Sequence, residues 1–325
     1  MSFGAEVLAL DGSTEIQRIS EWMVDSLANR LRRRGVVVAI SGGIDSSVCA
    51  ALAVRALGPE RVYGLLLPER DSSSDSARRG ELLARHLGIA FETHDIAPAL
   101  QALGCYRQRD DAIRHVVPEY TDAWKCKIVI SGGLERGINF FKLVVQSPDG
   151  AQREVRLPLR QYLQIVAATN FKQRVRKNIE YFHADRLNYA VIGTPNRLEY
   201  DQGFFVKNGD GAADLKPIAH LYKTQVYALA RHLGVIEEIV RREPTTDTYT
   251  LEQTQEDFYY SLHYSKLDLV LWAKNHGLSA ESVAAQLGYS PDQVRRVYDD
   301  IDQKRRATAY LHARPLLLEP IDEIP

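Results

Sequence analysis

Short apolar runs alternate along the chain with longer segments whose apolar residues recur every three or four positions. Residues 14–34 follow the second pattern and predict an amphipathic helix. Val36–Ile40 is a β-branched apolar run, which is typical of a strand buried on both faces of a sheet. Further strands are expected at Val62–Leu67, Ile89–Ile96 and Tyr189–Ile192, and further helices between residue 47 and Leu57, at Asp75–Leu87 and at Leu221–Leu233. This alternation predicts an α/β fold with a doubly wound, mostly parallel sheet.

The stretch from 105 to 169 breaks this alternation. Phe140–Gln146 and Arg153–Leu159 are strand-like and flank the turn tetrapeptide Ser147–Gly150, so a β-hairpin is expected there. From about residue 251 the sequence is polar and helical in pattern. We therefore predict an α/β domain built from 1–104 and 170–250, an insertion with the hairpin at 105–169, and a helical C-terminal region at 251–325.

The segment VAISGGIDSSV at Val38–Val48 carries the clearest chemistry, because a buried strand runs through a small polar loop into a helix. Glycines let backbone N–H groups approach an anion closely, and a helix N-terminus presents free N–H groups and a positive dipole end. The loop is therefore predicted to hold phosphate. Its candidate residues are Ser41, Gly42, Gly43, Asp45, Ser46 and Ser47.

Other phosphate and nucleophile motifs do not match this segment. It is neither G-x-x-x-x-G-K-[ST] nor G-x-G-x-x-G, and the chain contains no G-x-S-x-G elbow. An ordinary Gly-Gly turn with a serine cap is the alternative interpretation. The agreement of strand, loop and helix favours the phosphate loop.

Charge and cysteine content narrow the class of protein further. The formal net charge is -1, from 41 basic and 42 acidic residues, which gives no reason to expect nucleic acid or an anionic membrane as a partner. Cys49, Cys105 and Cys126 form no C-x-x-C pair, and no apolar run reaches the roughly 18 residues of a membrane span. None of the 9 histidines has a neighbour at metal-ligand spacing, so zinc is not expected. We expect a cytoplasmic protein without a membrane segment.

The loop sequence SGGIDSS resembles the pyrophosphate loop of the N-type ATP pyrophosphatases, which adenylate their substrates and share an adenine nucleotide alpha-hydrolase-like fold. The loop alone does not choose among members of this superfamily. NFKQRVR at 170–176, GTPNRLEYDQGFFVKNGDGAADLKPI at 193–218, LYKTQV at 221–226 and EPTTD at 243–247 resemble the ammonia-dependent NAD synthetase family in order and spacing.

The resemblance implies three groups of site residues. Asp45, Glu199 and Thr245 match positions that hold Mg²⁺ against the ATP phosphates, and hard oxygen ligands suit that ion. Positions that contact ATP are matched by Arg174, Arg176, Thr194 and Lys223. Positions that face deamido-NAD are matched by Tyr181, Lys207, Asp210, Asp214 and, near the C-terminus, Gln303, Lys304 and Arg305, where Gln303 departs from the usual histidine. Taken singly, each could be an ordinary surface, turn or cap residue; their joint order favours the site.

The reaction implied by the resemblance is adenylation of the deamido-NAD carboxylate by ATP, followed by amidation with ammonia to give NAD, AMP and pyrophosphate. Asp45 and Lys223 would act on the phosphates, and Asp210 could hold ammonium and help to deprotonate it. The family resemblance also implies a homodimer. Only about 35 residues precede the first strand, so we expect no glutaminase domain and ammonia that is either free or supplied by a separate protein.

Two alternatives stay open at this point. The insertion at 105–169 exceeds what compact family members carry, so an amide-forming ligase of the same chemistry could act on a different carboxylate. Leu278–Ile301 also resembles a helix-turn-helix, as in a DNA-binding regulator. Residues 292–306 carry four acids against five bases, which is a weak DNA-binding face, and a packed helical hairpin is favoured.

Overall fold

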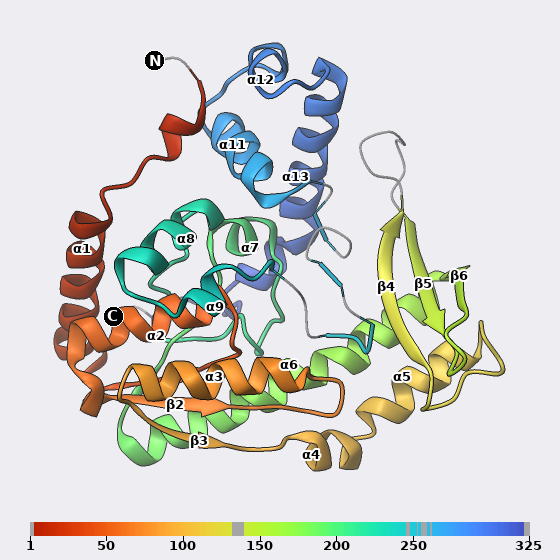
Figure 1. Cartoon of the computed structure of the whole chain (residues 1–325), viewed down its shortest axis with the longest axis horizontal. Helices are drawn as coiled ribbons and strands as arrows, with labels where there is room; N and C mark the ends of the chain where they lie inside the picture. The colour runs from red at the N-terminus through yellow and green to blue at the C-terminus, as the bar shows by residue number, and fades with distance from the viewer. Residues whose placement is uncertain are drawn as a thin grey trace.

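A computed structural model describes residues 3–131, 140–244, 248–251, 253–254, 259–260 and 262–321. Its central sheet has the order β3-β2-β1-β7, and all neighbouring strands are parallel (Figure 1). The strands are β1 (Val36–Ala39), β2 (Val62–Leu66), β3 (Ala90–Thr93) and β7 (Ala190–Val191). All four lie within or beside the segments predicted as strands, and the predicted α/β fold class is confirmed.

Alternation along β1 gives the sheet two buried faces. Val36 and Val38 pack into a core built with α1 (Gly12–Asp25), α2 (Ile44–Leu57), α3 (Ser74–His86) and α8 (Lys223–His232). Val37 points to the other face, where it packs with Val175 of α6 (Leu159–Leu187). Successive side chains of a strand point to opposite faces, so a continuous apolar run is what a sheet covered on both sides requires.

Helix ends in this core follow local sequence signals. Asp11 caps α1 by accepting hydrogen bonds from the backbone nitrogens of Ser13 and Thr14 at 3.0 and 3.1 Å. A π-helical turn, η2 (Ser26–Leu31), continues α1 to the left-handed Arg32. Gly58, with φ of +82°, ends α2 and leads through the short turn η3 (Pro59–Arg61) into β2.

A second sheet of three antiparallel strands stands beside the first, at the right of Figure 1. It consists of β4 (Lys125–Ser131), β5 (Phe140–Gln146) and β6 (Gln152–Arg156), and the register pairs Gln146 with Gln152. The predicted hairpin is therefore confirmed as β5 and β6. Strand β4 was not predicted, although Cys126 and Ile128 are fully buried and alternate with lysines, which is the usual signal of a half-buried strand.

The remaining helices connect and cover these sheets. They include α4 (Ala97–Ala102) and α5 (Cys105–Arg114), and between β7 and the C-terminal region lie α7 (Arg197–Gln202), α8 and α9 (Glu237–Val240). Helix α6 is continuous for 29 residues and passes through position 170, where we placed the start of the second α/β segment. None of the helices among the described residues is both long enough and apolar enough to cross a bilayer.

The C-terminal region contributes α11 (Tyr264–Asn275), α12 (Ala280–Leu287) and α13 (Pro291–His312), which lie at the top of Figure 1. Val270, Val283, Val294 and Ile301 from these helices form a common apolar core, joined by residues of the short N-terminal turn η1 (Ala5–Leu8). Arg295 of α13 is paired with Glu281 and Asp292. The helix-turn-helix-like segment is thus a packed helical hairpin in this structure.

Candidate active site

The predicted loop lies where the parallel strands end. Ser41 follows β1, Leu67 follows β2 and Gly193 follows β7, and the carboxyl ends of parallel strands share one edge of a sheet. Side chains from α6 and α7 reach the same edge. Arg176 of α6 donates from Nε to the carbonyl oxygen of Leu67 at 3.1 Å.

The loop itself is held by its own serines. The hydroxyls of Ser46 and Ser47 donate to the carbonyl oxygen of Gly43 at 3.1 and 2.7 Å, and Ser46 Oγ accepts from the backbone nitrogen of Ser41 at 3.2 Å. Gly42 has φ of +75°, and a Cβ there would overlap the carbonyl oxygen of Ser76. Only glycine fits this position, and the resulting turn starts α2 at Ile44 without a side-chain cap. The arrangement suits an anion at the helix N-terminus.

Four polar residues meet beside the loop. Lys223, the first residue of α8, donates from Nζ to Oδ2 of Asp45, and Asn196 donates from Nδ2 to Oδ1 of Asp45 at 3.1 Å. Asn196 also starts α7 through a capping box. Its Oδ1 accepts from the backbone nitrogen of Leu198 at 2.9 Å, and Glu199 Oε2 accepts from the Asn196 nitrogen at 3.1 Å. The structure thus brings together Asp45, Glu199 and Lys223, which were predicted as site residues, and Asn196, which was not.

The charge on Lys223 is secured by its neighbours. Its side chain is 1% exposed, and such burial alone would lower the pKa of the ammonium group. The carboxylates of Asp45 and Glu199 outweigh that effect and raise the pKa of Lys223 above its ordinary value. A permanent buried cation therefore lies next to the phosphate loop.

A second group of predicted residues lies at the end of α13. Lys207 donates from Nζ to the carbonyl oxygens of Tyr310 and Ala313, at 2.7 and 3.4 Å, where a helix C-terminus attracts cations. Arg174 donates from Nε to the carbonyl oxygen of Lys207 at 3.2 Å. A cavity of about 270 Å³ adjoins this contact. It is lined by Lys207, Asn208, Gly211, Ala212, Leu311, Ala313 and Pro315.

Tyr181, Asp210 and Asp214 were predicted to face the substrate, and all three form hydrogen bonds within the protein. The Tyr181 hydroxyl donates to Oδ1 of Asp214 at 3.4 Å, while Oδ2 of Asp214 accepts from the backbone nitrogen of Val191 at 2.7 Å. Asp210 Oδ1 accepts from the backbone nitrogen of Val206 at 2.7 Å. Burial raises the pKa of the Asp210 carboxyl group, in spite of that hydrogen bond.

Other predicted residues are placed differently. Lys304 donates to the carbonyl oxygen of Tyr259 at 2.7 Å and to Asp300 at 2.6 Å, and Arg305 binds Asp201 of α7 at 2.6 and 2.8 Å. These cations hold α13 against the rest of the protein. Gln303 is exposed and Thr194, after β7, is half-buried. Thr245 lies outside the described residues.

A buried ionic cluster was not predicted. Lys172, which is 2% exposed in α6, donates to Glu69 at 2.9 Å, to Asp71 at 2.8 Å and to the carbonyl oxygen of Thr248 at 2.9 Å. Arg109 of α5 pairs with Asp71 at 2.6 Å. Burial opposes the charge on Asp71, but Lys172 and Arg109 prevail and lower its pKa to about 2. The cluster joins α5 and α6 to the chain that follows β2.

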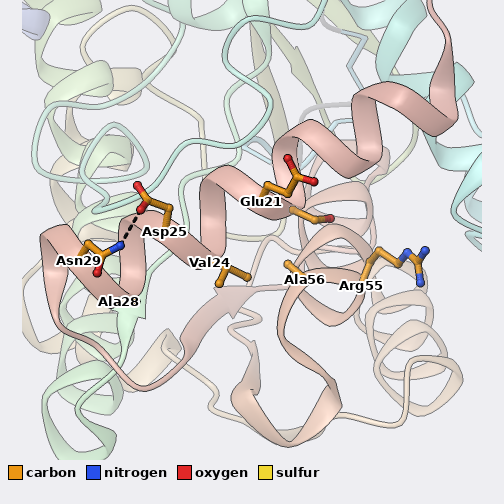
Figure 2. Close-up of a pocket in the computed structure, with 8 residues that line it drawn as sticks. Glu21, Val24, Asp25, Ala28, Asn29, Arg55 and Ala56 are labelled. Atoms are coloured by element: carbon orange, nitrogen blue, oxygen red, sulfur yellow. Dashed lines mark hydrogen bonds between the residues drawn. The ribbon is translucent and has the colours of Figure 1, made fainter.

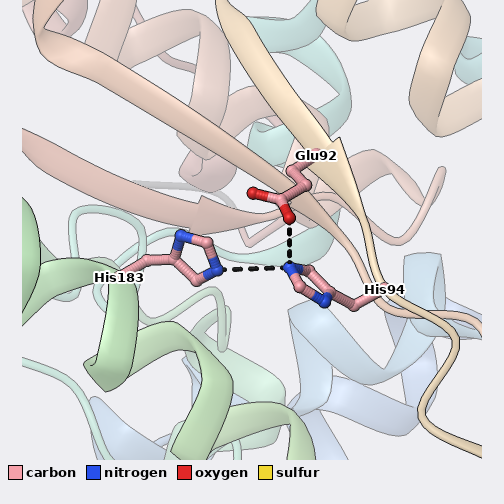
Figure 3. Close-up of side chains that lie close together, drawn as sticks. All are labelled: Glu92, His94 and His183. Carbon is pink, nitrogen blue, oxygen red and sulfur yellow. Dashed lines mark hydrogen bonds and ion pairs between the residues drawn. The ribbon is translucent and has the colours of Figure 1, made fainter.

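Two histidines far apart in sequence also meet. Figure 3 shows His94, after β3, between Glu92 at 2.7 Å and His183 of α6 at 3.3 Å. Arg186 donates to Nδ1 of His183 at 2.8 and 3.0 Å. Burial, followed by the charge of Arg186, lowers the pKa of His183. Nε2 of His94 lies beside the Glu92 carboxylate, which can only accept, so His94 donates to Glu92 and the group links β3 to α6.

A larger hollow of about 490 Å³ lies on the outer face of α1 and α2 (Figure 2). Its lining contains none of the predicted site residues. The lining residues are Ser20, Glu21, Val24, Asp25, Ala28, Asn29, Arg55 and Ala56. The chemistry-bearing residues gather instead at the carboxyl edge of the sheet.

The parallel sheet, with its Ser-Gly-Gly loop after β1, has the adenine nucleotide alpha-hydrolase-like fold of solved NAD synthetases. The family model described as NAD synthase matches residues 15–123 and 137–308. The NH(3)-dependent NAD(+) synthetase of Rhizobium meliloti (strain 1021) is 58% identical over 99% of this chain and 96% of its own length. That of Thermotoga neapolitana is 33% identical over 88% of this chain and 92% of its own length.

Solved structures agree with this assignment. The NMN synthetase from Francisella tularensis has a TM-score of 0.65 at 25% identity, covering 96% of this chain and 99% of its own. The NH3-dependent NAD synthetase from Campylobacter jejuni has the same fold, with a TM-score of 0.63 at 22% identity, covering 96% and 100%. The chain belongs to the NAD synthase family, as its sequence motifs predicted.

Proposed function

We propose that this protein uses ATP and ammonia to convert the carboxylate of deamido-NAD into the amide of NAD, releasing AMP and pyrophosphate. The observation that carries the proposal is the buried Lys223–Asp45 ion pair beside the Ser41–Ser47 loop, in a chain of the NAD synthase family. The predicted enzyme class, a ligase that forms a C–N bond, is confirmed by family membership.

In the first half-reaction, an oxygen of the substrate carboxylate attacks the α-phosphorus of ATP, and the bond between that phosphorus and the bridging oxygen to the β-phosphate breaks. Negative charge grows on the departing pyrophosphate. Backbone N–H groups of the loop and the first turn of α2 face that charge, and the Lys223 ammonium neutralises part of it. Most of the rate gain comes from holding the groups in line and from these fixed charges.

Magnesium fits the same place. Asn196 donates to Asp45 from its side chain and to Glu199 from its backbone, both at 3.1 Å, so two carboxylates of the kind that Mg²⁺ prefers lie beside one residue. These two side chains would hold the ion, together with Thr245. The ion would supply further positive charge to the ATP phosphates.

In the second half-reaction, the nitrogen of ammonia attacks the acyl carbon, AMP leaves with the bond electrons, and the nitrogen loses a proton. We assign the proton to Asp210, whose raised pKa makes its carboxylate a stronger base. Lys207, Arg174, Arg176, Tyr181, Asp214, Gln303 and Lys304 are proposed to contact the substrates.

We also propose the oligomeric state, the cellular location and the source of ammonia. Leu159 and Leu163 lie one turn apart on α6 and are 71% and 54% exposed, which supports the predicted homodimer through an apolar contact. Three free cysteines, all buried, support a reducing, cytoplasmic location. Ammonia would be free or supplied by a separate glutaminase.

The test is pyrophosphate release from ATP with Mg²⁺ and ammonium, measured with and without deamido-NAD. Release that depends on deamido-NAD, with NAD and AMP formed in equal amounts, is the expected result. Nicotinate mononucleotide serves as the competing acid, because one structural relative is an NMN synthetase. A larger kcat/KM with nicotinate mononucleotide, or release that needs neither acid, would overturn the assignment of the substrate.

A further inference from the structure

A buried carboxylate from the C-terminal region holds the helix that carries Lys223. Asp268 of α11 is 0% exposed, and it lies 45 residues after Lys223 in the chain. Its Oδ1 accepts from the backbone nitrogen of Lys223 at 3.2 Å, and its Oδ2 accepts from that of Thr224 at 2.7 Å. One carboxylate thus binds two consecutive amides in the first turn of α8.

This contact meets two needs of a helix start at once. The first N–H groups of a helix have no acceptor within the helix, and its N-terminus attracts negative charge. Burying a carboxylate is nevertheless costly: burial raises the pKa of Asp268 to about 6, while the two backbone donors oppose that shift. The backbone amides of Lys223 and Thr224 thus bind an acceptor on α11, which lies more than 40 residues further along the chain.

The contact matters because Lys223 carries the ammonium group that lies beside the phosphate loop. Lys223 is held at its backbone by Asp268 and at its tip by Asp45, while its side chain is buried along the whole length between them. Tyr264 of α11 stacks on Tyr227 of α8, with ring centroids 5.4 Å apart, and fixes the two helices side by side. The position of the ammonium is therefore set by α11 as well as by α8.

We propose that Asp268 is a positioning residue for the first half-reaction, and that the C-terminal helices place the Lys223 ammonium at the phosphate loop through it. The proposal rests on the proposed function, and it assigns to the region after residue 250 an indirect part in ATP cleavage. Asp268 itself touches neither ATP nor the substrate in this scheme. Its influence passes through the backbone of Lys223.

The experiment begins with the wild-type chain, in which deamido-NAD-dependent release of pyrophosphate tests the proposed function independently. Asp268→Asn then keeps the shape of the side chain but turns one acceptor into a donor that faces an N–H group. We expect kcat for adenylation to fall about 10- to 100-fold, as for a displacement near 1 Å, with KM for deamido-NAD and ammonia within about twofold. Asp302→Asn is the matched control, because Asp302 pairs with Lys274 in the same region at 2.8 Å and is 42% exposed.

A double-mutant cycle separates positioning from general damage. In a Lys223→Met background, followed by single-turnover quench over hours, Asp268→Asn should change the adenylation rate less than twofold. Equal fold losses in both backgrounds would overturn the proposal, and so would an unchanged kcat in Asp268→Asn. Circular dichroism and Tm of each variant show the folded fraction, to which the rates are normalised.

Discussion

Replacing Lys172 by methionine should destabilise the whole fold, although the residue is proposed to do no chemistry. Its ammonium is bound to Glu69 and Asp71, whose side chains are 0% and 1% exposed. Methionine has a similar length and no charge, so the change leaves the two buried carboxylates in place without the positive charge of Lys172 beside them. Breaking a buried ion pair on one side costs about 3–5 kcal/mol.

The remaining partners set the size of the effect. Tyr106 still donates to Glu69 at 2.8 Å and Arg109 still binds Asp71, which places the loss near the lower end, at about 3 kcal/mol. An unfolding entropy of about 2.1 cal/mol/K per residue over 325 residues turns 3–5 kcal/mol into a drop of about 4–7 °C in Tm. Differential scanning calorimetry measures this shift.

The matched control is Lys142→Met. Lys142 binds Glu154 at 2.8 Å on the surface of the second sheet, where the glutamate is 57% exposed, and exposed pairs contribute about 0–1 kcal/mol. Adding Glu69→Gln to Lys172→Met should restore part of the lost stability, because it removes the uncompensated charge. A Tm change of Lys172→Met no larger than that of Lys142→Met would refute the reasoning.

Three further predictions concern the loop, the buried lysine and acid stability. Gly42→Ala should abolish pyrophosphate release while the protein stays folded, because its positive φ and the Ser76 carbonyl leave no room for a Cβ; near-normal release in that variant would contradict the loop geometry. Lys223→Met should lower kcat roughly 10²- to 10³-fold, measured as deamido-NAD-dependent pyrophosphate release, and a loss below tenfold would remove Lys223 from the phosphate site. The pKa of Asp71 lies at about 2, below its ordinary 3.8, so it stabilises the fold above pH 4 and that contribution disappears between about pH 4 and 2. Urea unfolding across that range should show a smaller loss in Asp71→Asn than in the wild type.

The fold and the loop were predictable because their signals are local. A β-branched run such as Val36–Val38 reports burial on both faces, and the Gly-Gly pair with its serines reports a turn into a helix. The hairpin was found from its turn residues, whereas β4 was missed because its alternation of lysines and apolar residues is short. All of these signals act within about ten residues.

The contacts that hold the site together are of another kind. Lys172 meets partners 103 and 101 positions earlier in the chain, and Asn196 meets Asp45 across 151 positions. No pattern along the sequence marks such pairs, since each residue alone is compatible with a solvated surface. Asn196 did carry one local sign, the capping box with Glu199, which indicates a helix start but not a neighbour in the site.

The ionic cluster also bears on the insertion at 105–169. Its first helix, α5, supplies Arg109, which is 2% exposed and binds both Asp71 and Asp110. Asp71 follows β2, at the edge of the sheet where the phosphate loop lies. It forms an ion pair with Lys172, which stands two residues before Arg174 on α6. Helix α5 cannot move away from α6 without leaving those buried charges unpaired. Helix α5 of the insertion is therefore fixed to α6, the helix that carries Arg174 and Arg176, and the β4–β6 sheet shares an apolar core with both helices.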